Sequence, residues 1–230
     1  MSCSSKIAQF ETSRVRDRLI LQAGVSKASN APAGTHARRC IAGKVDLVVS
    51  GKMQTKEEVT LQDVQVRLLG EGDSLAELTS LLHRAYAELG AMGFRYKAVD
   101  QSVEVTRARI SNGECYIAVR DGELMGSAVL LPPSWRPAHC EWYARPEVAV
   151  LSQFAVDPRF QRRGVGSKLI HHLEARAREL GAEELSIDTA EGATHLIELY
   201  QRRGYRSVGT AQWEHTNYRS VLLSKRLAPH

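Results

Sequence analysis

The sequence predicts a mixed α/β (α+β) protein in which helices flank a mostly antiparallel central sheet. The first observation is the order of the expected elements: a strand–helix–strand–helix run is followed by a closing hairpin, which is typical of a mixed sheet covered by helices. The second is the apolar run from Ala149 to Val156, which predicts an interior strand. The third is composition, because 230 residues that are 43% hydrophobic and 25% charged suffice for one globular domain with a sizeable core.

Residues 1–60 precede this pattern and differ from it. They are rich in Ser, Ala, Gly, Lys and Arg, and no helical periodicity persists in them. We expect a disordered or non-native N-terminal extension here, because Met53 opens a more typical sequence and offers an alternative start. A secretory signal is not expected, since charges such as Arg16 and Asp17 interrupt the only stretch that could serve. The folded domain is therefore expected over residues 61–228.

The first half of this domain should contain a strand, helical segments and a hairpin. Ser74 followed by Glu77 is typical of a helix N-terminus, and Asp121-Gly122 is a strong signal for a two-residue hairpin turn. Residues 132–146 are rich in proline and aromatic residues and predict a long connection, a kind of loop that is often functional. The elements expected are a strand at 64–69, a helix over 75–86, a helical region at 94–110 and strands at 115–120 and 123–131.

The second half begins with the interior strand, which Asp157-Pro158 ends because proline cannot donate to a sheet. After a loop, Val165, Leu169 and Leu173 recur at helical spacing, and Gly181 closes that amphipathic helix. The elements expected beyond it are a strand at 185–188, a helix at 193–203 and strands at 206–213 and 218–227.

The loop between the interior strand and the amphipathic helix has the features of a phosphate site. It offers unpaired backbone N–H groups at a helix N-terminus, glycines that let a ligand approach, and two arginines. A Walker loop is excluded because position 159 is Arg rather than Gly and Lys168 follows a serine. The dinucleotide fingerprint is excluded because Leu169 stands where the third glycine belongs.

This region resembles the Gln-x-x-Gly-x-Gly signature of the GNAT superfamily of acyl-CoA-dependent N-acyltransferases, with Gln161, Gly164 and Gly166 in the defining places. The resemblance extends over about residues 62–228 and implies the GNAT fold, with acetyl-CoA as cosubstrate bound by its pyrophosphate on the loop. It also implies that the preceding strand splays from its neighbour and contacts pantetheine through its backbone. The cofactor-binding residues implied are Phe154, Ala155, Val156, Gln161, Arg162, Arg163, Gly164, Val165, Gly166 and Ser167.

The stretch from Leu199 to Tyr205 resembles a second motif of this family. The resemblance implies that the Tyr200 hydroxyl protonates the departing CoA thiolate. A phenol near pKa 10 is able to donate to a thiolate of pKa near 8.5. The family often has an Asn seven residues before that Tyr, where this chain has Ala193, so one cofactor contact is in doubt unless Thr194 or His195 substitutes for it.

The attacking amine must lose a proton before it reacts, so a base or a water chain is required. Glu147 is the preferred candidate for the base, and Glu141 and His139 are the others. Several aromatic side chains are expected to line the acceptor pocket, with Arg136 or Arg145 meeting a carboxylate. The aromatic candidates are Tyr86, Phe94, Tyr96, Trp135, Trp142 and Tyr143.

The remaining features limit the partners. A net charge of +5 favours an anionic ligand, and CoA is sufficient for that. No nucleic-acid module is apparent, no segment is long enough to span a membrane, and the adjacent His171 and His172 face different directions, so no metal is expected. Four cysteines without a framework indicate a reducing, cytoplasmic location. The sequence thus predicts an N-acetyltransferase acting on a primary amine of a small molecule or peptide. A non-catalytic acyl-CoA sensor and a nucleotide-binding regulator stay open as alternatives, and so does the oligomeric state, a homodimer included.

Overall fold

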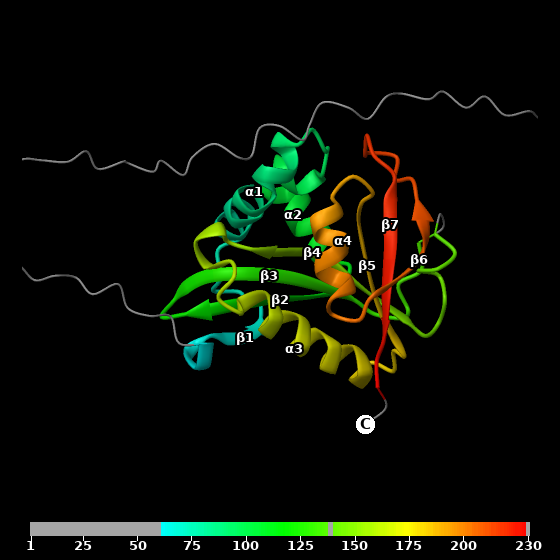
Figure 1. Cartoon of the computed structure of the whole chain (residues 1–230). Helices are drawn as coiled ribbons and strands as arrows, with labels where there is room; N and C mark the ends of the chain where they lie inside the picture. The colour runs from blue at the N-terminus through cyan, green and yellow to red at the C-terminus, as the bar shows by residue number, and fades with distance from the viewer. Residues whose placement is uncertain (1–60, 138–139, 229–230) are drawn as a thin grey trace, which may run out of the picture. The chain divides into compact units, whose positions relative to one another are not determined.

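The computed structural model describes residues 61–137 and 140–228. They form one seven-stranded sheet in the order β1-β2-β3-β4-β5-β7-β6 (Figure 1). The neighbours β4 and β5 run parallel, and the other five neighbouring pairs are antiparallel, which confirms the predicted sheet. The strands are β1 (Gln65–Leu68), β2 (Glu114–Arg120), β3 (Glu123–Leu131), β4 (Val148–Val156), β5 (Glu184–Ala190), β6 (Arg206–Ala211) and β7 (Ser220–Arg226).

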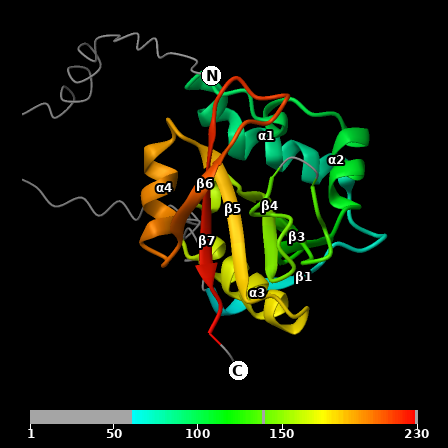
Figure 2. The ribbon, with the colours of Figure 1, turned by 90° about the vertical axis from the view of Figure 1, so that its right-hand side faces the viewer.

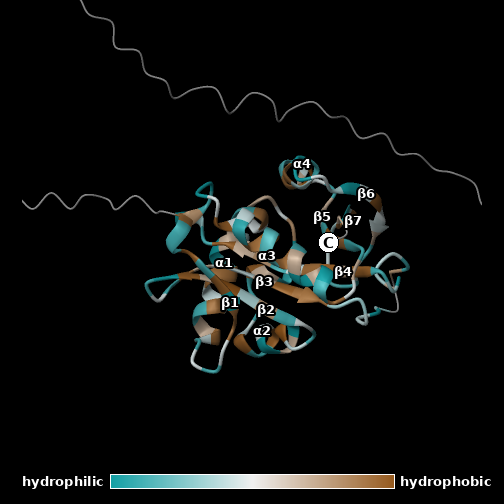
Figure 3. Ribbon diagram, turned by 90° about the horizontal axis from the view of Figure 1, so that it is seen from below, coloured by the Kyte–Doolittle hydropathy of each residue, from teal (hydrophilic) through white to brown (hydrophobic). Residues whose placement is uncertain are grey.

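Helices cover both faces of this sheet (Figures 1 and 2). On one face, α1 (Leu75–Ala91) and α2 (Val103–Ile110) bury leucines of α1 against β3 and β4. On the other, α3 (Val165–Glu179) and α4 (Thr194–Gln201) pack on a second core. The central strands β3 and β4, which lie between the two cores, are coloured largely hydrophobic in Figure 3. The layered α/β architecture predicted from the sequence is therefore confirmed.

Several local signals in the sequence produce the expected structure. The Ser74 hydroxyl accepts a hydrogen bond from Glu77 N at 3.2 Å and so caps α1. Asp121 and Gly122 have φ of +50° and +78°, as a type I′ turn requires, and they join β2 to β3 where Arg120 pairs with Glu123. Gly164, with φ of +84°, begins α3, and Gly181, with φ of +82°, follows its end.

The helical region expected at 94–110 is shorter than predicted. A single 3₁₀ turn occupies Lys97–Val99, and the α-helix begins only at Val103, where the Ser102 hydroxyl accepts from Val105 N at 3.3 Å. The helix is interrupted between them, at Gln101. This side chain points into the protein, where it is 5% exposed and bonds to Thr106. The segment before α2 therefore contributes side chains to the interior instead of a continuous helix.

Residues 1–60 lie outside the described residues. The expectation of a disordered or non-native extension, and of an alternative start at Met53, therefore stays a prediction, as does the domain boundary at residue 61. Among the helices described, none is both long and apolar enough to cross a bilayer. Within the same residues, no three His, Cys, Asp or Glu side chains gather as metal ligands would.

Candidate active site

The parallel strands β4 and β5 separate after a short paired stretch. Their register runs only from Val148 opposite Glu184 to Val150 opposite Ser186. Beyond these residues both strands continue, β4 to Val156 and β5 to Ala190, without pairing to each other. Figure 2 shows them diverging. We call this stretch, in which the two strands are not paired with each other, the splay (β4 residues 151–156 and β5 residues 187–190).

A β-bulge shapes the β4 side of the splay. Ser152 pairs with Val129 and Ala155 with Ser127, so Gln153 and Phe154 together stand opposite the single residue Ala128. Gln153 adopts φ of +49°, a left-handed conformation that is rare for a residue with a side chain. Bulges re-aim side chains and carbonyl groups next to active sites. Here the Phe154 carbonyl accepts a hydrogen bond of 3.2 Å from the Tyr86 hydroxyl of α1.

The loop after β4 presents its backbone N–H groups at the start of α3. The first backbone hydrogen bond of the helix runs from Lys168 N to Gly164 O at 3.0 Å, so the N–H groups of the preceding turn have no partner within the helix. A Cβ on Gly166 would lie 3.2 Å from the Phe154 ring, so glycine lets α3 pack closely on β4. Arg162 and Arg163 are exposed, and neither forms an ion pair among the described residues. This donor set fits a pyrophosphate.

A third arginine joins this end of α3. Arg203, in the turn after α4, donates from Nη2 to the Ser167 hydroxyl at 2.8 Å. The local sequence does not indicate this contact, because its partner lies 36 residues away. Its guanidinium therefore adds positive charge at the helix N-terminus, between α3 and α4. Gln161 is exposed, and its side chain donates to Val156 O at 3.2 Å.

Asp157 ties this loop to α1. Its fully buried carboxylate accepts hydrogen bonds from the Arg84 guanidinium at 2.7 and 2.9 Å and from both the backbone and the guanidinium of Arg159. Burial of the carboxyl raises its pKa, but the bonds from Arg159 and Arg84 outweigh burial and hold the pKa at about 2. The charged carboxylate is therefore a structural anchor for the turn between β4 and α3.

The Asp157 anchor predicts an acid-sensitive stability. The folded-state pKa of about 2 lies below the ordinary carboxyl value of 3.8, so the stabilisation is present above pH ~4 and is lost as the pH falls toward 2. It amounts to about 2 kcal/mol. We expect Asp157→Asn to lower the free energy of unfolding by roughly 3 kcal/mol at pH 7. The variant should also lose less stability than the wild type between pH 4 and pH 2, as measured by urea unfolding between pH 2 and 7. A variant whose stability falls with pH as steeply as that of the wild type would contradict the assignment.

Tyr200 lies at the end of α4, buried beside the splay. It is 4% exposed, and its ring stands 5.8 Å from that of Tyr205 in a T-shaped arrangement. Burial raises the pKa of Tyr200 well above 10, and the nearby Tyr86 and Tyr205 raise it further. The hydroxyl therefore stays protonated at neutral pH and keeps a proton to donate. Ala193 precedes α4 and is fully buried without a side-chain cap, so it leaves the first turn of that helix uncapped.

The predicted bases lie on two other segments. Glu147 precedes β4, where β4 and β5 are still paired, and its carboxylate bonds to the Arg145 guanidinium at 2.7 Å. Along the strand it is about 20 Å from Phe154. Glu141 is exposed, and His139 lies outside the described residues. The structure thus does not bring Glu147 together with the loop or with Tyr200.

The aromatic candidates separate into groups. Tyr86, Phe94 and Tyr96 form one cluster, with centroid distances of 5.4 and 6.4 Å to the Tyr96 ring, and Tyr218 stacks on Tyr96 at 4.7 Å. The Tyr96 hydroxyl accepts from Ala190 N at 2.7 Å, which places this cluster at the end of β5 in the splay.

Trp135 and Tyr143 belong to a second group, which includes Trp213. Trp142 packs under the Arg145 guanidinium at 4.4 Å, and the other predicted carboxylate ligand, Arg136, is exposed. Of the predicted acceptor residues, Tyr86, Phe94 and Tyr96 therefore lie together at the splay, and Tyr143 reaches it through its hydroxyl.

Asp188 is a site residue that sequence reasoning missed. It lies on the part of β5 that is not paired with β4, and its carboxylate accepts from the Tyr143 hydroxyl at 3.2 Å, from Trp213 Nε1 at 2.9 Å and from the Ser220 hydroxyl at 2.8 Å. The sequence treated Asp188 only as the last residue of a strand. An acidic residue at the end of the expected strand at 185–188 was the available signal.

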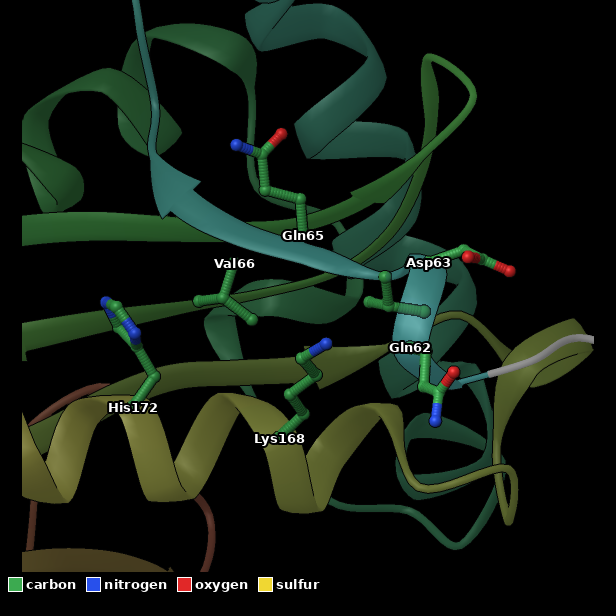
Figure 4. Close-up of a pocket in the computed structure, with 7 residues that line it drawn as sticks. Gln62, Asp63, Gln65, Val66, Lys168 and His172 are labelled. Carbon is green, nitrogen blue, oxygen red and sulfur yellow. The ribbon is translucent and has the colours of Figure 1, made fainter.

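A separate hollow lies between β1 and α3 (Figure 4). Figure 4 shows Lys168 and His172 of α3 facing Gln62 and Val66 across it. None of the predicted cofactor-binding or catalytic residues lines this hollow. It is therefore not the place where the motif residues meet, and the site is built instead around the splay and the loop before α3.

Comparison with known proteins agrees with this geometry. A family model described as "Acetyltransferase (GNAT) family" matches residues 76–205. The chain is 31% identical to an S-(2-succino)cysteine N-acetyltransferase of Bacillus subtilis (strain 168), over 60% of this chain and 82% of that protein. It is 24% identical to an S-alkylcysteine N-acetyltransferase of the same organism, over 58% of this chain and 74% of that protein.

Solved structures share the fold. A GNAT family acetyltransferase from Elizabethkingia anophelis with acetyl-CoA bound superposes with a TM-score of 0.51. The two chains are 20% identical, and the match covers 72% of this chain and 99% of that one. At this identity the likeness concerns the fold alone. The predicted fold is therefore supported by its own strand order and by a solved structure.

Proposed function

Because the chain belongs to the acetyltransferase (GNAT) family, we propose that it passes the acetyl group of acetyl-CoA directly to a primary amine of an S-substituted cysteine. Acetyl-CoA-dependent N-acetyl transfer is the activity of the family and of the named relatives, which gives no support to a non-catalytic sensor. The observation that carries the proposal is the splay beside the Gln161–Gly166 loop. The acceptor class rests on two relatives whose names specify S-substituted cysteines.

The loop and the bulged strand would hold the cosubstrate. The free N–H groups at the start of α3, with Arg162, Arg163 and Arg203 around them, suit the pyrophosphate. The backbone of Phe154, Ala155 and Val156 faces the splay and is available to pantetheine and to the thioester carbonyl. When bound, acetyl-CoA supplies the activated acetyl thioester. The chain's own contribution is positioning and polarisation of that carbonyl.

The proton balance requires two groups of the protein. A base removes a proton from the ammonium, so that the amine lone pair is free to form the new C–N bond. As the C–S bond breaks, the Tyr200 hydroxyl donates its proton to the leaving sulfur, and the proton released by the amine restores the phenol through solvent. Glu147 remains a proposed base. Asp188, on the part of β5 that is not paired with β4, near the tyrosine cluster, is a second proposed base.

Amine-dependent CoA release by the full chain tests this function. We expect the chain with acetyl-CoA to release CoA when S-methylcysteine or S-(2-succino)cysteine is added, and more slowly with lysine or a peptide N-terminus. Thiol titration and mass spectrometry of the N-acetylated product measure it. If acetyl-CoA raises the midpoint of thermal unfolding but no amine releases CoA, the chain is a sensor and the proposal is wrong.

The finer predictions about context are proposals as well. We propose a cytoplasmic enzyme without a nucleic-acid partner, and Cys115 and Cys140, which are free and buried, are compatible with a reducing compartment. A homodimer is also proposed, and light scattering of the purified chain at micromolar concentration tests it. A mass corresponding to 25.5 kDa would rule the dimer out.

A further inference from the structure

Arg109 of α2 is a half-buried cation without a carboxylate partner. Its Nη1 donates to Gln101 Oε1 at 2.6 Å, and no Asp or Glu oxygen among the described residues lies within ion-pair distance of it. Burying a guanidinium without an anion costs free energy unless another ligand supplies the charge. Arg176, another partly buried arginine, pairs with Glu114. Arg109 instead donates to a neutral amide oxygen among the described residues.

Gln153 provides a second donor without a partner beside it. This side chain is 5% exposed, its Oε1 accepts from Gln101 Nε2 at 3.1 Å, and its Nε2 makes no hydrogen bond to any described residue. Gln101 thus joins Arg109 to Gln153 in one row. Gln153 belongs to the bulge of β4, the strand that borders the splay, and the bulge conformation sets the direction of this buried amide. Two free donor groups, one of them charged, are the complement of a carboxylate.

The surroundings of Arg109 are those of the acceptor side of the splay. Burial lowers the pKa of Arg109, and Tyr86, Asp188 and Tyr218 are its titratable neighbours. Tyr86 also bonds to the Phe154 carbonyl on β4, and Tyr218 belongs to the tyrosine cluster. An acceptor in this place would meet aromatic faces, cationic and amide donors and one acid. An amine that also bears a carboxylate matches this set.

We propose that Arg109 and the Gln153 amide bind a carboxylate of the acceptor, next to the amine that is acetylated, so that this enzyme selects α-amino acids over plain amines. The inference rests on the proposed function, because it concerns the acceptor of that same reaction. In this arrangement Gln101 is a positioning residue, which holds the two donors in line. The acceptor's carboxylate would accept hydrogen bonds from the Arg109 guanidinium and from Gln153 Nε2.

A pair of amines that differ only in the carboxylate tests the inference. S-methylcysteine and 2-(methylthio)ethylamine share the reacting amine and the thioether, and only the first has the carboxylate. For the full chain we expect kcat/KM to favour S-methylcysteine by on the order of 10²-fold, mostly through KM. Arg109→Gln should remove this preference by raising KM for S-methylcysteine, with little change for 2-(methylthio)ethylamine, and Arg109→Lys should restore part of it.

Two further variants keep the result interpretable. Arg107→Gln changes an exposed arginine of the same helix and should keep the wild-type preference. Gln153→Glu retains the acceptor for Gln101 but replaces the free amide with a carboxylate that pairs with Arg109, so it should reduce the preference as Arg109→Gln does. Thermal stabilisation by CoA shows that each variant still folds and binds its cosubstrate.

The outcomes separate this inference from the proposed function. If the chain acetylates both amines equally well, or if Arg109→Gln lowers both rates equally, the carboxylate site is wrong while N-acetyl transfer stands. If neither amine releases CoA, the proposed acceptor class fails. Binding then decides the carboxylate site: S-methylcysteine, but not 2-(methylthio)ethylamine, must raise the unfolding midpoint of the CoA complex, and Arg109→Gln must abolish that shift. Without such a shift the inference is wrong.

Discussion

Glutamate in place of Gly164 is expected to weaken acetyl-CoA binding by at least about 10²-fold. It puts a negative charge beside the free N–H groups and arginines that we propose bind the pyrophosphate. Gly164 has φ of +84°, so any side chain there is also strained, and its Cβ would lie 2.4 Å from Leu61 Cδ1. The thermal shift produced by acetyl-CoA should disappear in Gly164→Glu at ligand concentrations that saturate the wild type.

Gly181 provides a matched control for this variant. It flanks the opposite end of α3 with φ of +82°, and a Cβ there would meet no atom within 4 Å. Gly181→Glu therefore carries the same backbone strain and the same added charge, away from the loop. It should lose stability through the backbone strain alone, without the clash with Leu61, and keep the shift produced by acetyl-CoA. Loss of the shift in both variants would show that strain, and not the phosphate site, causes the effect.

Phenylalanine in place of Tyr200 is expected to lower kcat by about 10²- to 10³-fold, the scale of losing a general acid. The ring is buried against Tyr205 and should keep its packing, because only the hydroxyl is removed. KM for acetyl-CoA should change little, since the cofactor contacts come from the loop and β4. Steady-state kinetics at saturating amine measure both quantities.

Variants of the proposed bases distinguish proton removal from proton donation. Loss of a base should depress kcat/KM most at low pH and be partly relieved at high pH, where more of the amine is already neutral. Glu147→Gln and Asp188→Asn can be compared in this assay, and the variant with the pH-dependent loss identifies the base. A Tyr200→Phe enzyme with wild-type kcat would show that the departing thiolate takes its proton from elsewhere.

Much of the fold could be predicted because its signals are local. The Asp121-Gly122 turn, the Ser74 cap and the glycines around α3 each depend on residues adjacent in sequence. The bulge at Gln153 could not be predicted, because its positive φ is stabilised by Gln101, 52 residues away, and by pairing with β3. Nothing in the local sequence favours that conformation at a glutamine.

The candidate site was predictable for its cofactor half and much less for its acceptor half. The loop from Gln161 to Gly166 is continuous in sequence, so its chemistry is visible in one motif. The acceptor side is assembled from α1, α2, β4, β5 and β7, and its polar members, Arg109 and Asp188, are single residues in otherwise ordinary segments. The predicted aromatic residues divided into separate groups, because Tyr86 of α1 contacts Tyr96 whereas Trp135 of the 132–146 connection contacts Tyr143.

The short pairing of β4 with β5 also has a mechanical consequence. Three residue pairs, Val148 to Val150 with Glu184 to Ser186, form the strand pairing between a four-stranded block, β1 to β4, and a three-stranded block of β5, β7 and β6, and the Glu147 carbonyl extends it by accepting from Glu183 N at 2.9 Å. The first block carries the cofactor loop through β4, and the second leads into α4 with Tyr200. The pairing at this seam therefore sets the spacing between the loop and Tyr200. Val148 and Val150, which are both buried, contribute to that spacing through packing and lie outside the splay.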